Sequence, residues 1–285
     1  MNSKYDAIVG IGCSFVWGAN ILNNDGKFIG NKYRATKLLS KYFKCPEINL
    51  AKPASGNDTI IKQGFDFVEQ NTDYSKPLLI IGFSGITRQQ VWSNFNNRYY
   101  DLHIFDWPNK NNKPEQYKEL LKSRSAKMLS INANPDLLET YAKVRGKFMF
   151  DLEAEQRRLH QNILLFDAYL EKHNIKRIYF NSVEDNIDLI KDRINYLSFD
   201  INKSDEPIRR ADFSMTQEKY KPEDCLYHFL RKKMKEENTS FDITDGEQNT
   251  RSNKPPYGKY MCGGHPSPYA NELLFNKIIE YENNI

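Results

Sequence analysis

A serine near the start of the chain and a histidine near its end are the residues best placed to do nucleophilic chemistry. Ser14 follows the short apolar run 7–12, and its turn ends at Gly18. His265 precedes an apolar helical pattern that closes the chain. A serine hydroxyl becomes a useful nucleophile when an imidazole takes its proton, so these two residues are candidates for nucleophilic chemistry. Each residue also has an ordinary role, because serines after strands often cap helices and isolated histidines are often structural.

Two cysteines beside this pair suggest other chemistry. Cys13 is an alternative nucleophile, but it continues the buried strand pattern and free cysteine is commonly buried, so we expect it in the core. Cys262 and His265 form half of a zinc site, and we expect no metal because a structural zinc needs four ligands. The Gly-x-Gly end of the first apolar run lacks the third glycine of a dinucleotide-binding turn, so no nucleotide cofactor is expected.

Alternating strands and helices must position these side chains. The apolar pattern predicts strands at 5–12, 47–51, 77–83 and 176–180, and helices at 33–43, 57–68, 152–173 and around 273–279. The strands are apolar on both faces, which is typical of a parallel sheet covered by helices on both sides. The sequence therefore predicts an α/β fold.

Two segments, at about 85–150 and 184–260, interrupt the alternation. Both are far longer than ordinary α/β connections. Both leave strand ends on the side where sites form in open α/β sheets. We expect one domain over 1–285 with these two insertions, and two domains as the alternative.

The composition excludes some classes of binding partner. The chain has 285 residues, 39% of them hydrophobic, and a formal net charge of +4 with the charges mixed along its length. Without a long basic block, we expect no nucleic-acid partner. The four cysteines are widely spaced, which favours reduced thiols. The first residues show no signal-peptide pattern and no run of about 18 apolar residues occurs, so we expect synthesis in the cytoplasm and no membrane partner.

The order of Ser14 and His265 resembles that of the SGNH, or GDSL-like, hydrolase family. The turn is similar to the family's looser Gly-x-Ser-Phe-x-x-Gly form, with Cys13 in place of the usual aspartate. The resemblance covers about residues 4–84, 151–183 and 258–283. It implies a three-layer flavodoxin-like parallel sheet and ester hydrolysis, in which Ser14 attacks the carbonyl and His265 is the general base.

The resemblance also implies an oxyanion hole. Gly56 matches the glycine whose N–H enters that hole in the family, although a Ser-Gly-Asn loop is also an ordinary turn with a helix cap. The family's asparagine after the third strand is missing, and Ser84 stands there, so its hydroxyl or backbone is expected to donate instead. Arg88 is expected to hold either a structural acid or a substrate carboxylate or phosphate.

The acid that orients the histidine is also missing from its usual place. The family has an aspartate two or three residues before the histidine, where this chain has Cys262 and Gly263. We expect an acid from the preceding segment (Asp242, Asp245 or Glu247) or a main-chain carbonyl to hold the ring. Such a partner matters, because losing the acid of a serine protease triad costs about 10⁴ in turnover.

Two functions follow from the resemblance. The first is an esterase that removes O-acetyl or similar small acyl groups from a carbohydrate, since the family often acts on such groups and the aromatic residues of 92–107 suit stacking on sugars. The second is a catalytically decayed SGNH-fold protein with a structural or binding role, favoured by the missing asparagine and aspartate and by insertions suited to protein partners. Similar Gly-x-Ser-Phe sequences are familiar among tailed-phage proteins, so incorporation into a virion belongs to this second reading.

Overall fold

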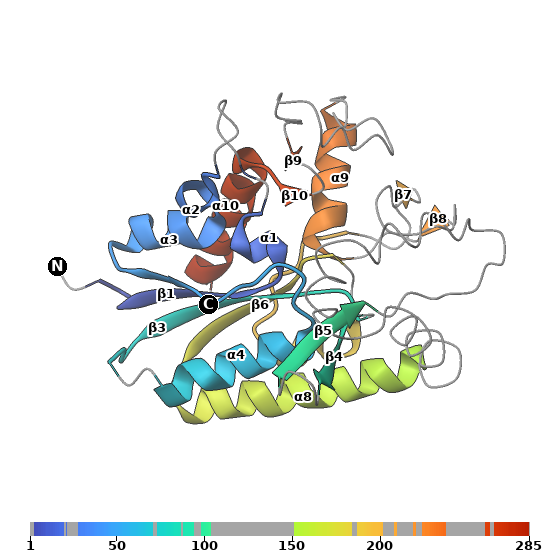
Figure 1. Cartoon of the computed structure of the whole chain (residues 1–285). Coiled ribbons are helices and arrows are strands. Elements are labelled where there is room, and N and C mark those ends of the chain that lie inside the picture. The colour runs from blue at the N-terminus through green and yellow to red at the C-terminus, as the bar shows by residue number, and fades with distance from the viewer. Residues whose placement is uncertain are drawn as a thin grey trace.

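The computed structural model describes residues 3–19, 21, 28–70, 73–86, 88–93, 98–103, 151–183, 187–201, 208–209, 219–220, 224–237, 260–262 and 265–284. Their core is a parallel sheet in the order β2-β1-β3-β6 (Figure 1). The strands are β1 (Ala7–Gly12), β2 (Glu47–Asn49), β3 (Pro77–Phe83) and β6 (Lys176–Asn181). This order is that of a flavodoxin-like sheet, so the predicted α/β class is confirmed.

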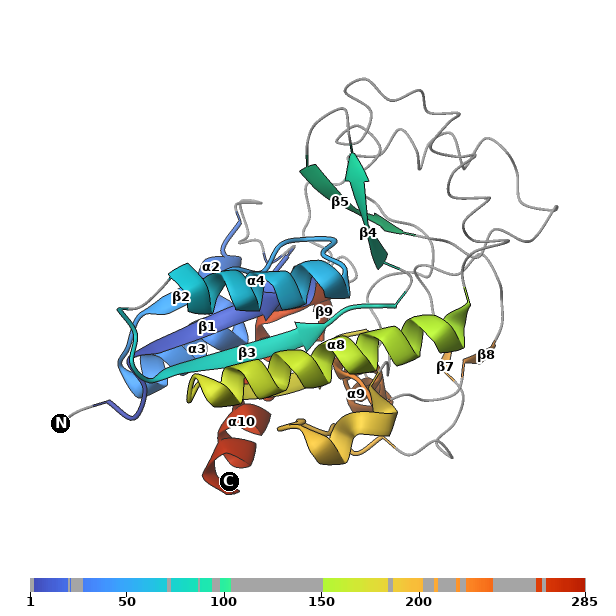
Figure 2. The same ribbon diagram turned by 90° about the horizontal axis from the view of Figure 1, so that it is seen from below.

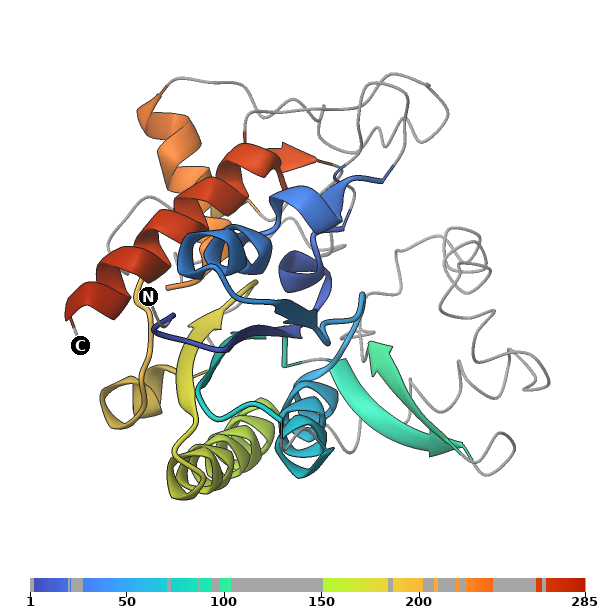
Figure 3. The same ribbon diagram turned by 90° about the vertical axis from the view of Figure 1, so that its left-hand side faces the viewer.

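Helices cover both faces of the sheet, which gives three layers. Figure 3 shows one layer with α3 (Ala35–Phe43), α9 (Leu226–Glu236) and α10 (Pro268–Asn284), and the other with α4 (Asn57–Gln70) and α8 (Leu152–Lys172). Alternation along the strands explains the two layers. Ile8, Leu78 and Ile80 lie in the core under α3 and α10. Val9 and Leu79 lie in the core under α4 and α8.

Within the described residues, an isolated β-bridge lies beside β6, where a fifth strand would extend the sheet. Tyr196 pairs in parallel with Tyr179 of β6. The amide of Tyr179 donates to the carbonyl of Asn195 at 2.9 Å, and that of Leu197 donates to the carbonyl of Tyr179 at 2.8 Å. The chain after β6 thus returns to the sheet edge, where the 3₁₀ helix η2 (Asp188–Arg193) precedes it.

The observed elements differ from the predicted ones mainly at their ends. The helix predicted at 33–43 is divided into α2 (Gly30–Tyr33) and α3, because Arg34 between them is extended at ψ 148°. The last helix begins at Pro268, earlier than its apolar pattern indicated, and proline is favoured at a first helical position because its missing N–H would be unpaired there.

The described parts of both insertions add small elements outside the sheet. In the first, β4 (Arg88–Ser93) and β5 (Arg98–His103) form an antiparallel hairpin, and Figure 2 shows it on the side of the carboxyl ends of the sheet strands. In the second, the short pairs are β7 (Ile208–Arg209) with β8 (Lys219–Tyr220) and β9 (Met261–Cys262) with β10 (His265–Pro266). The single domain stays a prediction. None of the described helices is long and apolar enough to cross a membrane.

Candidate active site

Glycines in the sheet let the short helix that carries Ser14 lie directly on the strands. The helix α1 (Ser14–Trp17) follows β1 after one residue. A Cβ on Gly12 would lie 2.5 Å from Cγ2 of Val16 in α1, and one on Gly82 would lie 2.7 Å from the same atom. Non-bonded carbon atoms do not approach this closely, so α1 needs glycine at both positions. The glycines thereby fix the height of Ser14 above the sheet edge.

Ser14 and His265 are brought together across almost the whole chain. The Oγ of Ser14 lies 3.0 Å from the Nε2 of His265, which is hydrogen-bond distance. Ser14 is buried with 6% of its surface exposed, and His265 is half-buried. The ring of Phe15 lies 5.8 Å from the imidazole between centroids. A serine and an imidazole in this arrangement can exchange a proton. Cys13 is fully buried, as expected.

Asn271 anchors the segment that carries His265, a role the sequence did not reveal. Its Nδ2 donates to the carbonyl of Pro266 at 3.2 Å and to that of Ser267 at 2.9 Å. Its Oδ1 accepts from the amide of Ala35 at the start of α3, at 3.1 Å. Asn271 is 1% exposed, so these bonds are shielded from water. This one side chain therefore ties the histidine segment to the layer that also holds α1.

Ser84 is held by Asn57 through two backbone bonds. The amide of Ser84 donates to Oδ1 of Asn57 at 2.8 Å, and Nδ2 of Asn57 donates to the carbonyl of Ser84 at 3.1 Å. The asparagine side chain thus pairs with Ser84 as a neighbouring strand would. The Ser84 amide, one of the predicted oxyanion donors, is therefore already used in this structure. The Ser84 hydroxyl accepts from Nη1 of Arg88 at 2.9 Å.

Gly56 lies in the loop that the Asn57 pairing holds against the end of β3. Gly56 is buried, and its carbonyl accepts the first bond of α4 from the amide of Ile60 at 3.0 Å. Two residues earlier, Ala54 is in the left-handed region at φ 67°, an uncommon conformation for a residue with a Cβ. Gly56 follows β2 while Ser14 follows the neighbouring β1. Its predicted role as an oxyanion donor stays a prediction.

The acids predicted to orient His265 lie outside the described residues. This holds for Asp242, Asp245 and Glu247, and for Gly263 at the family's usual aspartate position. The partner of the second ring nitrogen therefore stays a prediction. The described residues contain no group of three or more histidine, cysteine or acidic side chains that could hold a metal ion.

An aromatic pair stands one helical turn from Ser14. Trp17, at the end of α1, stacks on Phe28 with ring centroids 4.7 Å apart and planes 15° apart. Phe28 is 41% exposed. Residues three apart on a helix are neighbours on its surface, so this pair lies on the side of Ser14. The aromatic side chains of 92–107, predicted to stack on sugars, are not among the described side chains.

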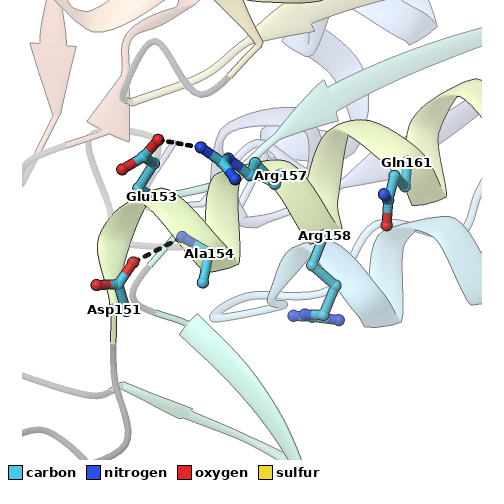
Figure 4. A pocket seen from close by; sticks show the side chains of 6 residues that line it. All are labelled: Asp151, Glu153, Ala154, Arg157, Arg158 and Gln161. Atoms are coloured by element: carbon cyan, nitrogen blue, oxygen red, sulfur yellow. Dashed lines mark hydrogen bonds and ion pairs between the residues drawn. The ribbon is translucent and has the colours of Figure 1, made fainter.

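A separate hollow of 310 Å³ lies at the start of α8 (Figure 4). None of the predicted site residues lines it; its lining residues are Asp151, Glu153, Ala154, Arg157, Arg158 and Gln161. The charges there are satisfied within the surface: Glu153 pairs with Arg157, and the Asp151 carboxylate caps α8 by accepting from the Ala154 amide at 2.7 Å. This hollow is therefore a surface feature apart from the candidate site.

The sequence matches no family model and no curated protein sequence. A solved structure from Desulfitobacterium hafniense DCB-2, provisionally described as a lipolytic protein of the G-D-S-L family, is similar at 10% identity over 97% of this chain and 99% of that chain, with a TM-score of 0.37. A likeness this weak supports no conclusion about function. The α/β sheet and the Ser14–His265 pair are the features of this protein that bear on its function.

Proposed function

We propose that this protein is an SGNH-type serine ester hydrolase. The observation that carries the proposal is the 3.0 Å distance between Oγ of Ser14 and Nε2 of His265 at the carboxyl edge of a parallel sheet. Ligand sites in open α/β sheets lie at this edge. The glycines under α1 and the Asn271 anchor both serve to hold this pair, which favours a maintained site over an accidental contact.

In the proposed reaction, His265 takes the proton of the Ser14 hydroxyl while Oγ attacks the ester carbonyl carbon. The tetrahedral intermediate collapses when the imidazolium of His265 gives that proton to the leaving alcohol, which leaves an acyl-Ser14. Water then attacks the acyl carbon with His265 as the base, and the acid leaves as Ser14 is restored. The step needs a neutral imidazole with Nε2 unprotonated, so a partner at Nδ1 must select this tautomer.

Three groups are proposed to stabilise the oxyanion. The Ser14 N–H is the first of a helix and has no intrahelical acceptor. The Gly56 N–H is the second, from the loop that Asn57 holds. The Ser84 hydroxyl, which accepts from Nη1 of Arg88, is the third. One such donor is worth about 10²–10³ in turnover.

We propose O-acetyl groups on a carbohydrate as the substrate. The stacked Trp17 and Phe28 near Ser14 support this, because sugars pack on the apolar faces of aromatic rings and Phe28 is 41% exposed. No cofactor enters the proposed reaction.

The test is hydrolysis of p-nitrophenyl acetate and of acetylated polysaccharides by the wild type and by single variants. We expect Ser14→Ala and His265→Ala each to lower kcat/KM by at least about 10³-fold. Ser40→Ala, which removes another buried serine hydroxyl on α3, is the matched control and should keep the activity. Unchanged unfolding temperatures must accompany the losses.

Two outcomes would contradict the proposal. Loss of activity in Cys13→Ala but not in Ser14→Ala would make the thiol the nucleophile. A wild type that cleaves neither kind of ester would instead favour a catalytically decayed SGNH-fold protein with a binding or structural role.

A further inference from the structure

An arginine from the first insertion reaches the edge of the sheet beside Ser84. Arg88 begins β4, and its Nη1 lies 2.9 Å from the Ser84 Oγ. Two residues along the same strand, Gln90 donates from Nε2 to the Thr59 hydroxyl in the first turn of α4, at 2.7 Å. Residues two apart on a strand share a face. The hairpin is therefore docked by the face that carries Arg88, and the guanidinium is held in place.

The guanidinium of Arg88 has no acidic partner among the described residues. Its side chain is half-buried, and the side-chain hydrogen bond that it makes with the described residues goes to a neutral hydroxyl. The acid in the nearby first turn of α4, Asp58, is taken by Arg158 of α8 in a two-bond pair at 2.8 and 3.2 Å. A guanidinium has five N–H donors, and a charge drawn from water is normally balanced by an opposite charge. With respect to the part of the chain that the structure describes, Arg88 is thus a cation held in place with donors left for a ligand.

The strand register places this cation near the reacting serine. Gly12 of β1 pairs with Gly82 of β3. Ser14 and Ser84 each follow two residues later, and adjacent strands are about 4.8 Å apart, so both leave the sheet at the same edge. Arg88 then lies one hydrogen bond beyond Ser84. The separation from Ser14 is on the order of 10 Å, the size of one sugar ring with its substituents.

We propose that Arg88 binds an oxyanion group, a carboxylate or a phosphate, on the alcohol part of the ester that Ser14 cleaves. The substrate would then be an acylated acidic carbohydrate. The planar fork of a guanidinium matches both oxyanions through two parallel hydrogen bonds. The inference rests on the proposed esterase function and specifies that the substrate is negatively charged.

The experiment compares three acetyl esters: 4-acetoxybenzoate, 4-acetoxyphenyl phosphate and the neutral methyl 4-acetoxybenzoate. The readout is the ratio of kcat/KM for each anionic ester to that for the neutral one. We expect Arg88→Gln to lower this ratio by about 10- to 100-fold, the range for a charge-assisted hydrogen bond. Arg88→Lys should retain part of the preference for the anionic esters. In the wild type, whichever anionic ester gives the larger ratio shows whether the site prefers a carboxylate or a phosphate. The control is Arg157→Gln, an exposed arginine on α8, which should leave the ratio unchanged.

A second measurement separates failure of this inference from failure of the esterase proposal. Calorimetry follows binding of 4-hydroxybenzoate and of its methyl ester to the wild type and to Arg88→Gln. If no ester is cleaved but the carboxylate binds and Arg88→Gln weakens it about 10-fold or more, the esterase proposal fails and the anion site stands. If esters are cleaved with the same ratio in wild type and Arg88→Gln, the esterase stands and the anion site is refuted. If no ester is cleaved and the carboxylate does not bind, both the esterase proposal and the anion site are refuted.

Discussion

Replacing Asn57 with alanine removes both hydrogen bonds that hold the backbone of Ser84, at 2.8 and 3.1 Å. Asn57 is 4% exposed and Ser84 is fully buried, so water does not readily replace them. A buried polar group left unpaired costs about 1–3 kcal/mol. Two such groups, partly relieved by local relaxation, predict a loss of about 3 kcal/mol in the free energy of unfolding. In a chain of this length that lowers the unfolding temperature by roughly 6–10 °C.

The assay is chemical denaturation of Asn57→Ala beside Asn49→Ala. Asn49 is the matched control, since its side chain accepts one bond, from the Ala51 amide at 3.0 Å, in a half-buried position. We expect a loss of about 1 kcal/mol for that variant. A loss below about 1 kcal/mol for Asn57→Ala would refute the claim that this side chain substitutes for a strand partner.

The stability of Asn57→Asp should depend on pH if Asn57 pairs with the backbone of Ser84. The carboxylate still accepts from the Ser84 amide, but its other oxygen faces the Ser84 carbonyl and must be protonated to donate to it. The native state therefore raises the pKa of this carboxyl above its unfolded value, and the stabilising contribution is present below the unfolded pKa and lost as pH rises. The penalty relative to wild type should be smaller at about pH 4 than at pH 7. Equal penalties at both pH values would contradict the pairing.

Three further changes test other parts of the fold. Gly12→Ala should lower the free energy of unfolding by about 1–3 kcal/mol, because its Cβ would meet a carbon at 2.5 Å. Gly10→Ala should cost less, because the atom nearest to its Cβ is a side-chain methyl at 3.0 Å. Equal losses for the two variants in chemical denaturation would contradict the close packing of α1 on the sheet. Lys44→Gly should stabilise by about 0.5–1 kcal/mol, because Lys44 ends α3 at φ 53°; a loss of stability would refute this. Burial and the bond to Glu282 raise the pKa of Tyr5 above 10.0, so its contribution should be lost as pH rises beyond that value, and Tyr5→Phe should flatten the alkaline fall in unfolding temperature. An unchanged fall would contradict this.

Local features of the sequence were enough to predict the sheet. The apolar runs that became β1 and β3 are buried along their whole length, so their pattern alone identifies strands of a parallel sheet. The glycines that punctuate these runs also marked the turn at Ser14. Their physical reason, the space they leave for Val16, depends on a helix lying across two strands and is visible only in the fold.

The contacts that complete the site join residues far apart in the chain. The Ser14–His265 pair was predicted from the chain order of a resembling family, since nothing local links residues 251 apart. The Ser-Gly-Asn loop that contains Asn57 was interpreted as a turn with a helix cap, and the pairing of Asn57 with Ser84 was not predicted, because the strand order brings the two residues together. Arg88 was predicted to hold either a structural acid or a substrate carboxylate or phosphate. Among the described residues no acid pairs with it, because the nearby Asp58 is paired with Arg158.

The activation of Ser14 by His265 is the central claim, and covalent labelling by a fluorophosphonate tests it most directly. The reagent reacts with a serine only when a base makes its hydroxyl nucleophilic. Mass spectrometry should place one adduct on Ser14 in the wild type and none in Ser14→Ala, and His265→Ala should react at least about 10²-fold more slowly. A wild type that carries no adduct at Ser14, or that reacts no faster than His265→Ala, would contradict the account.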